Sequence, residues 1–371
     1  MNMNEEEQNV EKKKKKKLPY FIIFVLILLS MICFGAYYCY EFGLFQLKEE
    51  TVNIKEKNKK NTEEIKKQTP SRFAFLNKSD NYVLYLASDK YFETGQKDVI
   101  ANSNNMYAVA SYKNKLYYID DSKKLTIYDI DTKQSEQYPI TSIELNYNTS
   151  ILPGEKYVII SNVLRFELIN VEEKTNTLLG ELNDRGSGLL DNDNNTLYHS
   201  RAKTLRFKNI ETGASDEIQG VNGYAIYQDD NYIYIDGENE NNIDEFHSYD
   251  KKSHKIEKLN IKDYNEFVSG ITTITKIDND LYLTFNNNEK LIKYSNNKES
   301  FILEKDFIRF FNINNKLYIA SAELKCSELC GPGEFNEFYI YDPKKGKLEN
   351  TNNQYIKELF NSYQPVIYEL R

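Results

Sequence analysis

The sequence predicts an all-β fold of repeated four-stranded units that follows a single N-terminal transmembrane helix. Three observations predict it: a turn-plus-strand phrase recurs seven times, a second strand phrase follows it in order, and one long apolar run precedes every copy. These features divide the 371 residues into a tail over 1–17, a transmembrane helix over 18–40, a stalk over 41–70 and a repeat domain over 71–371.

The first phrase is a turn rich in Asn, Asp, Gly and Lys, followed by an alternating apolar run. Its copies read DNYVLYLAS, NKLYYID, GEKYVIIS, NNTLYHS, DNYIYID, NDLYLTF and NKLYIAS. The paired anchor residues begin at 84, 116, 156, 197, 233, 281 and 317, so successive copies are 32 to 48 residues apart. Turn residues followed by alternating, β-branched or aromatic residues predict a strand that is entered from a tight turn.

A second strand and turn follow in most units, as in LTIYDIDTKQ, LRFKNIETGA and FYIYDPKKGK, with a shortened KYFETGQK in the first unit. Apolar stretches precede each anchor (FAFL, MYAVAS, IELNY, GLL, YAIY, TITKI and RFFNI), and a fourth stretch such as SEQYPI follows. Four short strands repeated at this period are typical of propeller blades. We therefore predict a seven-bladed β-propeller, with six or eight blades as alternatives. A large β-sandwich does not predict equal units, and the units of a β-helix are much shorter.

These blades resemble those of bacterial β-propeller repeat proteins with tyrosine-rich blades and turns of the type Tyr-Asp-x-x-Thr/Lys-Gly. The resemblance extends from 71 to about 353, and the chain departs from WD-type blades because its 30 tyrosines are accompanied by no tryptophan. It implies the fold and no particular function. A last strand is predicted over 365–370, where it closes the ring against the first blade and removes an exposed edge. An incomplete eighth blade is the alternative.

The apolar run over 18–40 contains no charged residue and follows six lysines at 12–17. Its 23 residues are enough for a helix that crosses about 30 Å of hydrocarbon. A cleaved signal peptide has a shorter apolar core and a small-residue cleavage site, neither of which is found here. The lysines predict a signal-anchor with a cytoplasmic N-terminus and an extracytoplasmic C-terminal domain at the cell membrane. The lipid bilayer is therefore one predicted partner, contacted through 18–40.

Charge limits the other partners. The stalk over 41–70 is rich in Lys, Glu and Asn and predicts a tether. Six lysines and four glutamates in the first forty residues leave 41–371 with a charge of −10 within the net −8. An acidic domain argues against sequence-independent nucleic-acid binding, which uses basic patches. An unidentified protein or glycan is the second predicted partner.

The three histidines outside the membrane segment do not form a recognisable site. His199, His247 and His254 fall on or beside predicted strands, and their spacing matches no metal-binding or nucleophile motif. We interpret them as structural residues. No catalytic residue, cofactor or metal is predicted.

Acidic turns are interpreted in the same way. The run DNDNN over 191–195 begins like a calcium loop, but Thr196 and Ala202 stand where an EF-type loop has Gly and Glu. Pairs such as Asp278 and Asp280 recur at turn positions, where Asp is favoured without any ligand. Whether two carboxylates flank a cleft, as glycosidase chemistry requires, is a tertiary question.

Insertions mark the expected binding face. The fifth unit is longer between its second and third strands at 237–245, the seventh at 323–337, and the connection over 261–270 lies on the same predicted face. Inserted loops on one face often carry function in repeat proteins. The candidate binding residues are Gly237, Glu238, Glu240, Asp244, Glu328, Gly331 and Glu334.

The seventh-unit insertion also contains the two cysteines that lie outside the membrane segment. Cys326 and Cys330 are a candidate disulfide, because an extracytoplasmic location is oxidising and a closed loop would stiffen the insertion. A redox pair normally has two intervening residues, whereas three separate these.

The leading functional hypothesis is a membrane-tethered, non-catalytic binding or interaction module that presents a looped propeller face to a ligand or protein partner. Two hypotheses compete with it. The domain could be a propeller hydrolase or lyase that acts on envelope glycans or lactones, or it could be a structural scaffold of an envelope assembly.

Overall fold

The structure is a computed structural model that describes residues 72–78, 81–162, 165–181, 188–201, 204–239, 241, 243–262, 264, 273–285, 289–326, 330–332, 334–361 and 367–370. Contacts divide the chain into Met1–Pro70 and Ser71–Arg371, and every described residue belongs to the second unit. Within these ranges no helix is long and apolar enough to cross a membrane. The predicted tail, transmembrane helix and stalk, over 1–17, 18–40 and 41–70, lie outside the described residues.

The predicted all-β class is confirmed. The first sheet is ordered β29-β1-β2-β3: Ile367–Leu370, Arg72–Lys78, Tyr82–Ser88 and Lys97–Ser103. The next is β4 to β7: Met106–Tyr112, Lys115–Asp120, Lys124–Asp129 and Gln134–Pro139. The third is β8 to β11: Ser150–Leu152, Tyr157–Ser161, Arg165–Asn170 and Thr175–Glu181.

A seven-stranded sheet follows, from β12 to β18: Gly188–Asp191, Thr196–Arg201, Thr204–Asn209, Ser215–Gln228, Tyr232–Glu238, Asp244–Asp250 and Ile256–Lys258. After it comes β19 to β22: Thr273–Ile277, Asp280–Phe285, Lys290–Ser295 and Lys298–Glu304. The last four-stranded sheet is β23-β24-β27-β28: Phe307–Ile313, Lys316–Ala322, Glu337–Asp342 and Lys347–Asn350. A hairpin of β25 and β26 (Leu324–Cys326 and Cys330–Pro332) is inserted in it. Among the described residues the α-helices are α3 (Tyr91–Thr94) and α4 (Gln354–Asn361).

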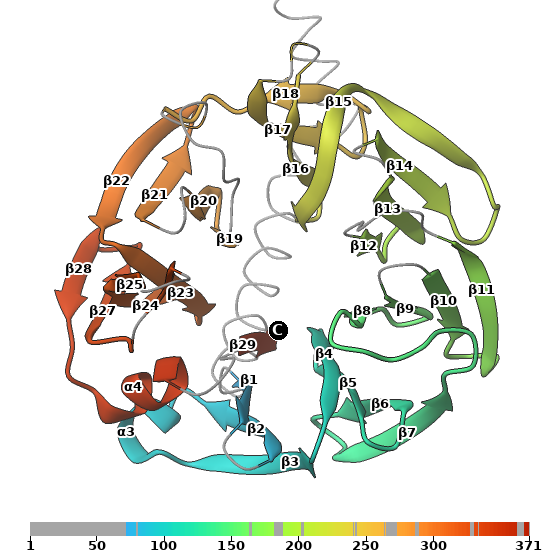
Figure 1. Cartoon of the computed structure of the whole chain (residues 1–371), viewed down its shortest axis with the longest axis horizontal. Coiled ribbons are helices and arrows are strands. Elements are labelled where there is room, and N and C mark those ends of the chain that lie inside the picture. The colour runs from blue at the N-terminus through green and yellow to red at the C-terminus, as the bar shows by residue number, and fades with distance from the viewer. Residues whose placement is uncertain are drawn as a thin grey trace, which may run out of the picture. The chain divides into compact units, whose positions relative to one another are not determined.

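Within this unit the sheets follow one another in chain order around a ring (Figure 1). The inner strands of neighbouring sheets contact each other: β29 contacts β4, β4 contacts β8 and β8 contacts β12. On the other side β19 contacts β23, and β23 contacts β29. Strands from both ends of the described range therefore meet in the first sheet, where Phe75 pairs with Ile367 and Arg72 with Leu370.

Middle strands are the most deeply buried because each sheet packs between two neighbours, whereas an inner strand such as β4 is mostly half-buried. All five residues of β9, from Tyr157 to Ser161, are buried. The buried clusters of the described residues lie between adjacent sheets or between the two halves of the seven-stranded sheet. Fully burying one such apolar side chain contributes about 1.5–3 kcal/mol. The fold is therefore stabilised by the interfaces between sheets. This explains why many strands contain more apolar residues than an alternation of apolar and polar residues would give.

Two predictions for individual segments are wrong. KYFETGQK, expected as a strand, contains α3, and IELNY precedes the short strand β8 in a connection over 140–149. In the first sheet the anchor residues at 84 and 85 lie in the third strand from the centre, whereas those at 116 and 117 lie in the second. The reason is that β29 takes the inner position, so every strand of the first unit moves outward by one place.

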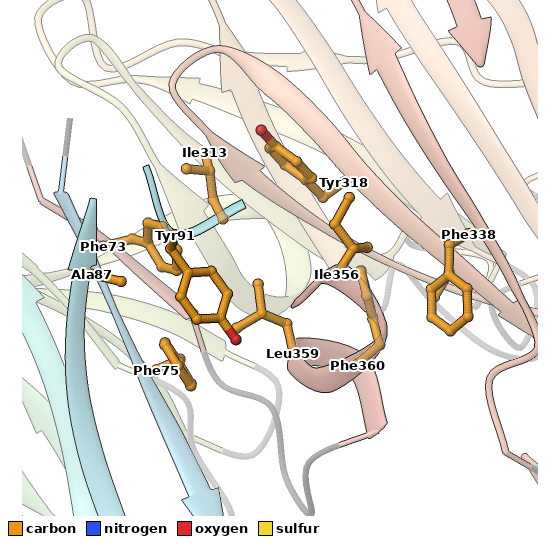
Figure 2. Packing of buried hydrophobic residues seen from close by; sticks show 11 residues of the cluster. Phe73, Phe75, Ala87, Tyr91, Ile313, Tyr318, Phe338, Ile356, Leu359 and Phe360 are labelled. Atoms are coloured by element: carbon orange, nitrogen blue, oxygen red, sulfur yellow. The ribbon is translucent and has the colours of Figure 1, made fainter. Parts of the chain in front are cut away.

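α4 fills the space between the last sheet and the first. Ile356, Leu359 and Phe360 are at most 2% exposed, and Figure 2 shows them between Phe73 of β1 and Phe338 of β27. A helix with one apolar face suits this position because it can satisfy its own backbone while packing against two sheets. The helix is also held by an ion pair from Glu358 to Lys97 on β3.

Consecutive strands of each sheet are antiparallel, so their connections alternate between two faces of the ring. The face with the turns at 113–114, 153–156, 192–195, 229–231, 278–279 and 314–315 is called the turn face. The opposite face, called the insertion face, carries the connections at 140–149, 239–243 and 323–336.

Candidate functional site

The turns of the turn face bring amide and carboxylate side chains together. Asp278, Asn314 and Asn315 have φ angles of 54°, 54° and 56°. Two-residue hairpin turns require such left-handed backbone, which Asn, Asp and Gly tolerate best. A backbone requirement therefore concentrates polar side chains at one end of the ring.

Two cavities open among these turns. The larger, of about 650 Å³, is lined by Tyr227, Gln228, Asp229, Asp230, Asn231, Lys276, Asp278, Asn279, Asn314 and Asn315. The smaller, of about 350 Å³, is lined by Ser111, Tyr112, Leu152, Pro153, Leu189, Leu190, Asp191, Asn192, Asp193, Gln228, Asp229, Asp230 and Lys251. Both include 228–230, so they adjoin at the end of β15. Together they are called the acidic mouth.

Asp229 is the best-anchored carboxylate of the acidic mouth. Its Oδ1 accepts hydrogen bonds of 2.8 Å from the backbone N–H groups of Asn231 and Tyr232, and its Oδ2 accepts one of 3.0 Å from the Tyr234 hydroxyl. Lys276 forms an ion pair with the same oxygen. Burial acts to raise the pKa of Asp229, but the hydrogen bond from Lys276 and the two backbone N–H groups outweigh it and hold this pKa below its ordinary value.

A second network ties the two halves of the seven-stranded sheet together. Lys251 Nζ donates a 3.2 Å hydrogen bond to Gln228 Oε1 and lies 3.5 Å from Asp191 Oδ2. Gln228 Nε2 donates to the carbonyl oxygen of Leu190 at 2.7 Å. The side chains of Lys251 and Asp191 are 7% and 5% exposed. Buried charges are stable when they are paired, so these residues form a preorganised floor of the smaller cavity.

The acidic mouth is negative overall. Its lining has five aspartates, at 191, 193, 229, 230 and 278, against two lysines, Lys251 and Lys276. Both lysines are paired with aspartates, whereas Asp193, Asp230 and Asp278 are exposed at the rim. The mouth thus offers hydrogen-bond acceptors and negative charge to a ligand, held on rigid strand ends.

The predicted binding residues of the fifth unit lie mostly in strands. Gly237 and Glu238 belong to β16 and Asp244 to β17, where Glu238 pairs with Asp244. Gly237 lies opposite Gly223, and a Cβ added to it would approach the Gly223 Cα to 3.0 Å. The expected loop is therefore largely a longer hairpin, in which Gly237 has a packing role.

Of the remaining predicted residues, Glu240 belongs to the fifth-unit insertion, and the other three belong to the seventh-unit insertion. Glu240 and Glu328 fall outside the described residues, Gly331 is in β26, and Glu334 is exposed. On the backbone, Cys326 and Cys330 lie directly opposite each other in the β25–β26 pair. Opposite residues of antiparallel strands have Cα atoms about 4.5–5.5 Å apart, within the range that a disulfide bridges. The disulfide stays a prediction.

None of the three histidines lines either cavity of the acidic mouth. His199 packs edge-on against Phe166, and His254 Nδ1 lies 2.5 Å from the Tyr249 hydroxyl. His247 Nε2 is 3.1 Å from a Glu245 oxygen. Burial lowers the pKa of His247, although Glu245 acts in the opposite direction. In the part of the chain that the structure describes, no group of His, Cys, Asp and Glu residues could hold a metal ion.

The candidate calcium loop has an internal explanation. Asp191 accepts hydrogen bonds from the Asp193 backbone N–H at 3.2 Å and from Asn194 Nδ2 at 2.9 Å. The acidic turns can be recognised one by one from the sequence. Their convergence from different sheets cannot, because no local pattern in the sequence signals it.

Comparisons with known proteins support the fold alone. A scan against protein-family models and a search of curated proteins find no match to the sequence. Among solved structures, a prolyl endopeptidase has a TM-score of 0.53 at 12% identity, covering 76% of this chain and 49% of its own. The chain thus spans about half the length of that enzyme, and the likeness shows a β-propeller-like fold.

Two further solved structures are similar at lower scores. The computationally designed Ika8 protein has a TM-score of 0.47 at 11% identity, with 76% of this chain and 87% of that chain covered. The extracellular domain of a one component system protein of B. thetaiotaomicron has a TM-score of 0.45 at 11% identity, with 76% and 46% covered.

Proposed function

We propose that this chain is a membrane-tethered, seven-bladed propeller that binds a polar ligand or protein partner in its acidic mouth without catalysing a reaction. The blade count treats the seven-stranded sheet as two blades that share β15 and takes β29 as the strand that closes the ring. The apolar run over 18–40 is the anchor, the stalk is 41–70, and the propeller is extracytoplasmic.

The observation that carries the proposal is the pair of adjoining cavities at 228–230. Ligand sites are usually preformed concavities of about 300–1,000 Å³ with a few placed polar groups. The volumes of the two cavities, about 350 and 650 Å³, fall within this range. Their polar groups come from turns and strand ends whose backbones are fixed in the sheets.

The electrostatics of Asp229 favour binding over acid–base chemistry. A general acid or base works best with a pKa close to the operating pH. The pKa of Asp229 is instead lowered, away from neutral pH, because Lys276 and backbone N–H groups stabilise the carboxylate. Asp229 is then a permanent negative charge, which is useful for holding a ligand and poor for transferring a proton.

Site-specific photo-crosslinking in intact cells tests the proposed site. A benzophenone amino acid at Asn279, on the rim of the larger cavity, should give a discrete adduct. The same residue at Phe301, which is 59% exposed on β22, is the matched control and should give none. An adduct at Ile243, 45% exposed on the insertion face, without one at Asn279 would move the function to that face and contradict the proposal.

The tether has its own test. Full-length protein should remain in the membrane fraction after carbonate extraction, and protease added to intact cells with a permeable outer layer should digest 71–371. Deletion of 18–40 should release the chain from the membrane. Release of the unaltered protein from the membrane fraction by carbonate would contradict the anchor.

A further inference from the structure

The smaller cavity of the acidic mouth combines an apolar wall with a buried ion pair. Leu152, Pro153 and Leu189 line one part of it, and Asp191 and Lys251 line another. The larger cavity is lined mainly by Asp and Asn residues. The two cavities therefore suit different chemical groups, and the smaller one can recognise a ligand that is partly apolar.

Lys251 has an unused hydrogen-bond capacity. Its ammonium group has three donors. One serves Gln228 at 3.2 Å, and the Asp191 oxygen lies 3.5 Å away, which is long for a charged pair. Asp191 itself is shared with the Asp193 N–H and with Asn194. An oxygen atom of a ligand can therefore accept a hydrogen bond from Lys251 without breaking the floor of the cavity.

The rim supplies the opposite charge. Asp193 and Asp230 line the smaller cavity from two different turns, and both are exposed. Asp229 already forms an ion pair with Lys276, so it attracts a cationic ligand less strongly than these two carboxylates do. Two carboxylates at the rim of one cavity favour a cation, and the same cavity is also lined by the ammonium group of Lys251 and by apolar side chains.

We infer that the smaller cavity binds an apolar α-aminoacyl group: its protonated amine lies at Asp193 and Asp230, its carbonyl oxygen accepts from Lys251, and its side chain packs on Leu152 and Leu189. This inference rests on the proposed binding function of the acidic mouth. A volume of about 350 Å³ is at the lower end of the range for small-molecule sites, so the group is one or two residues long. It comes either from a free amino acid or from the N-terminus of a peptide.

Calorimetry of the full chain in detergent micelles tests this with five probes. L-Leucinamide should bind, and N-acetyl-L-leucinamide should bind at least ten-fold more weakly because the charged hydrogen bonds of the amine are lost. Glycinamide should also bind at least ten-fold more weakly, since it buries no side chain. Tighter binding of free L-leucine would identify an amino acid as the ligand, and tighter binding of Leu-Gly-Gly would identify a peptide.

Variants locate the site. Asp230→Asn should weaken L-leucinamide roughly three- to five-fold, as expected for an exposed charge pair. Asp306→Asn is the matched control, because Asp306 is exposed and lines neither cavity of the acidic mouth, so the affinity should be unchanged. Thermal unfolding of both variants verifies that they fold.

Three results would overturn the inference: no heat with any probe at millimolar concentration, equal binding of the acetylated probe, or equal effects of the two variants. None of them bears on the proposed function, which is tested by the crosslink at Asn279 in the larger cavity. Conversely, amine binding without that crosslink would support the smaller cavity as the ligand site and contradict a partner bound at the larger cavity.

Discussion

Gly95→Ala measures how tightly α3 is held against α4, the helix that fills the space between the last and first sheets. Gly95 follows α3 with a φ of 71°, in the left-handed region. A Cβ at this position would lie 3.0 Å from Tyr355 Cζ and 3.2 Å from Tyr355 Cδ1, and closer still to Cε1. The Tyr355 ring packs 5.5 Å from the ring of Tyr91, which is fully buried.

The magnitude has two parts. Left-handed backbone costs a non-glycine residue about 1 kcal/mol. Overpacking against a held ring costs about 1–3 kcal/mol more. We expect Gly95→Ala to lower the free energy of unfolding by about 2–4 kcal/mol. The matched control is Gly213→Ala, because Gly213 also has a φ of 71° but no atom within 4 Å of the added Cβ. It should cost about 1 kcal/mol.

The assay is urea unfolding of the full chain in detergent micelles, followed by circular dichroism in the β-sheet region. Both variants are compared with the unaltered chain at one pH and one micelle concentration. The difference between the variants isolates the contact with Tyr355. Equal destabilisation, within about 0.5 kcal/mol, would show that Tyr355 moves aside freely and would refute a tightly packed α3–α4 contact.

Three other predictions concern the core, the acidic mouth and the insertion. Leu359→Ala should cost about 2–5 kcal/mol in urea unfolding because Leu359 is 1% exposed, whereas Leu178→Ala, at 42% exposure, should cost much less. Because the pKa of Asp229 is lowered, its carboxylate stabilises the fold above its ordinary pKa of 3.8, and this contribution is lost as the pH falls through the lowered value. The unfolding midpoints of the unaltered chain and Asp229→Asn should therefore converge as the pH falls below 3.8. Non-reducing peptide mass spectrometry of the protein from an oxidising compartment should find Cys326 joined to Cys330; quantitative alkylation of both thiols would contradict this.

Sequence patterns were sufficient for the local structure. Alternating apolar residues after Asn- and Asp-rich turns indicate strands, because side chains of a strand alternate and left-handed turns favour these residues. The positions of β5, β16 and β24 follow this rule, and so does the all-β class. The segment KYFETGQK was predicted as a shortened copy of the second strand, but the helix α3 forms there.

By itself, the sequence determined which segments are strands, the acidic character of the turns and the repeat that builds a β-propeller-like fold. The sequence also predicted a last strand that pairs with the first blade, and β29 does pair with β1. Only the tertiary structure decided the register of that pairing, that α4 packs between the last sheet and the first, and that 228–230 joins two cavities. Strand propensity and turn chemistry act over a few neighbouring residues, so they can be recognised locally. Pairing between Arg72 and Leu370, or convergence of turns from several sheets, depends on how distant segments pack, and no short window of sequence contains that information.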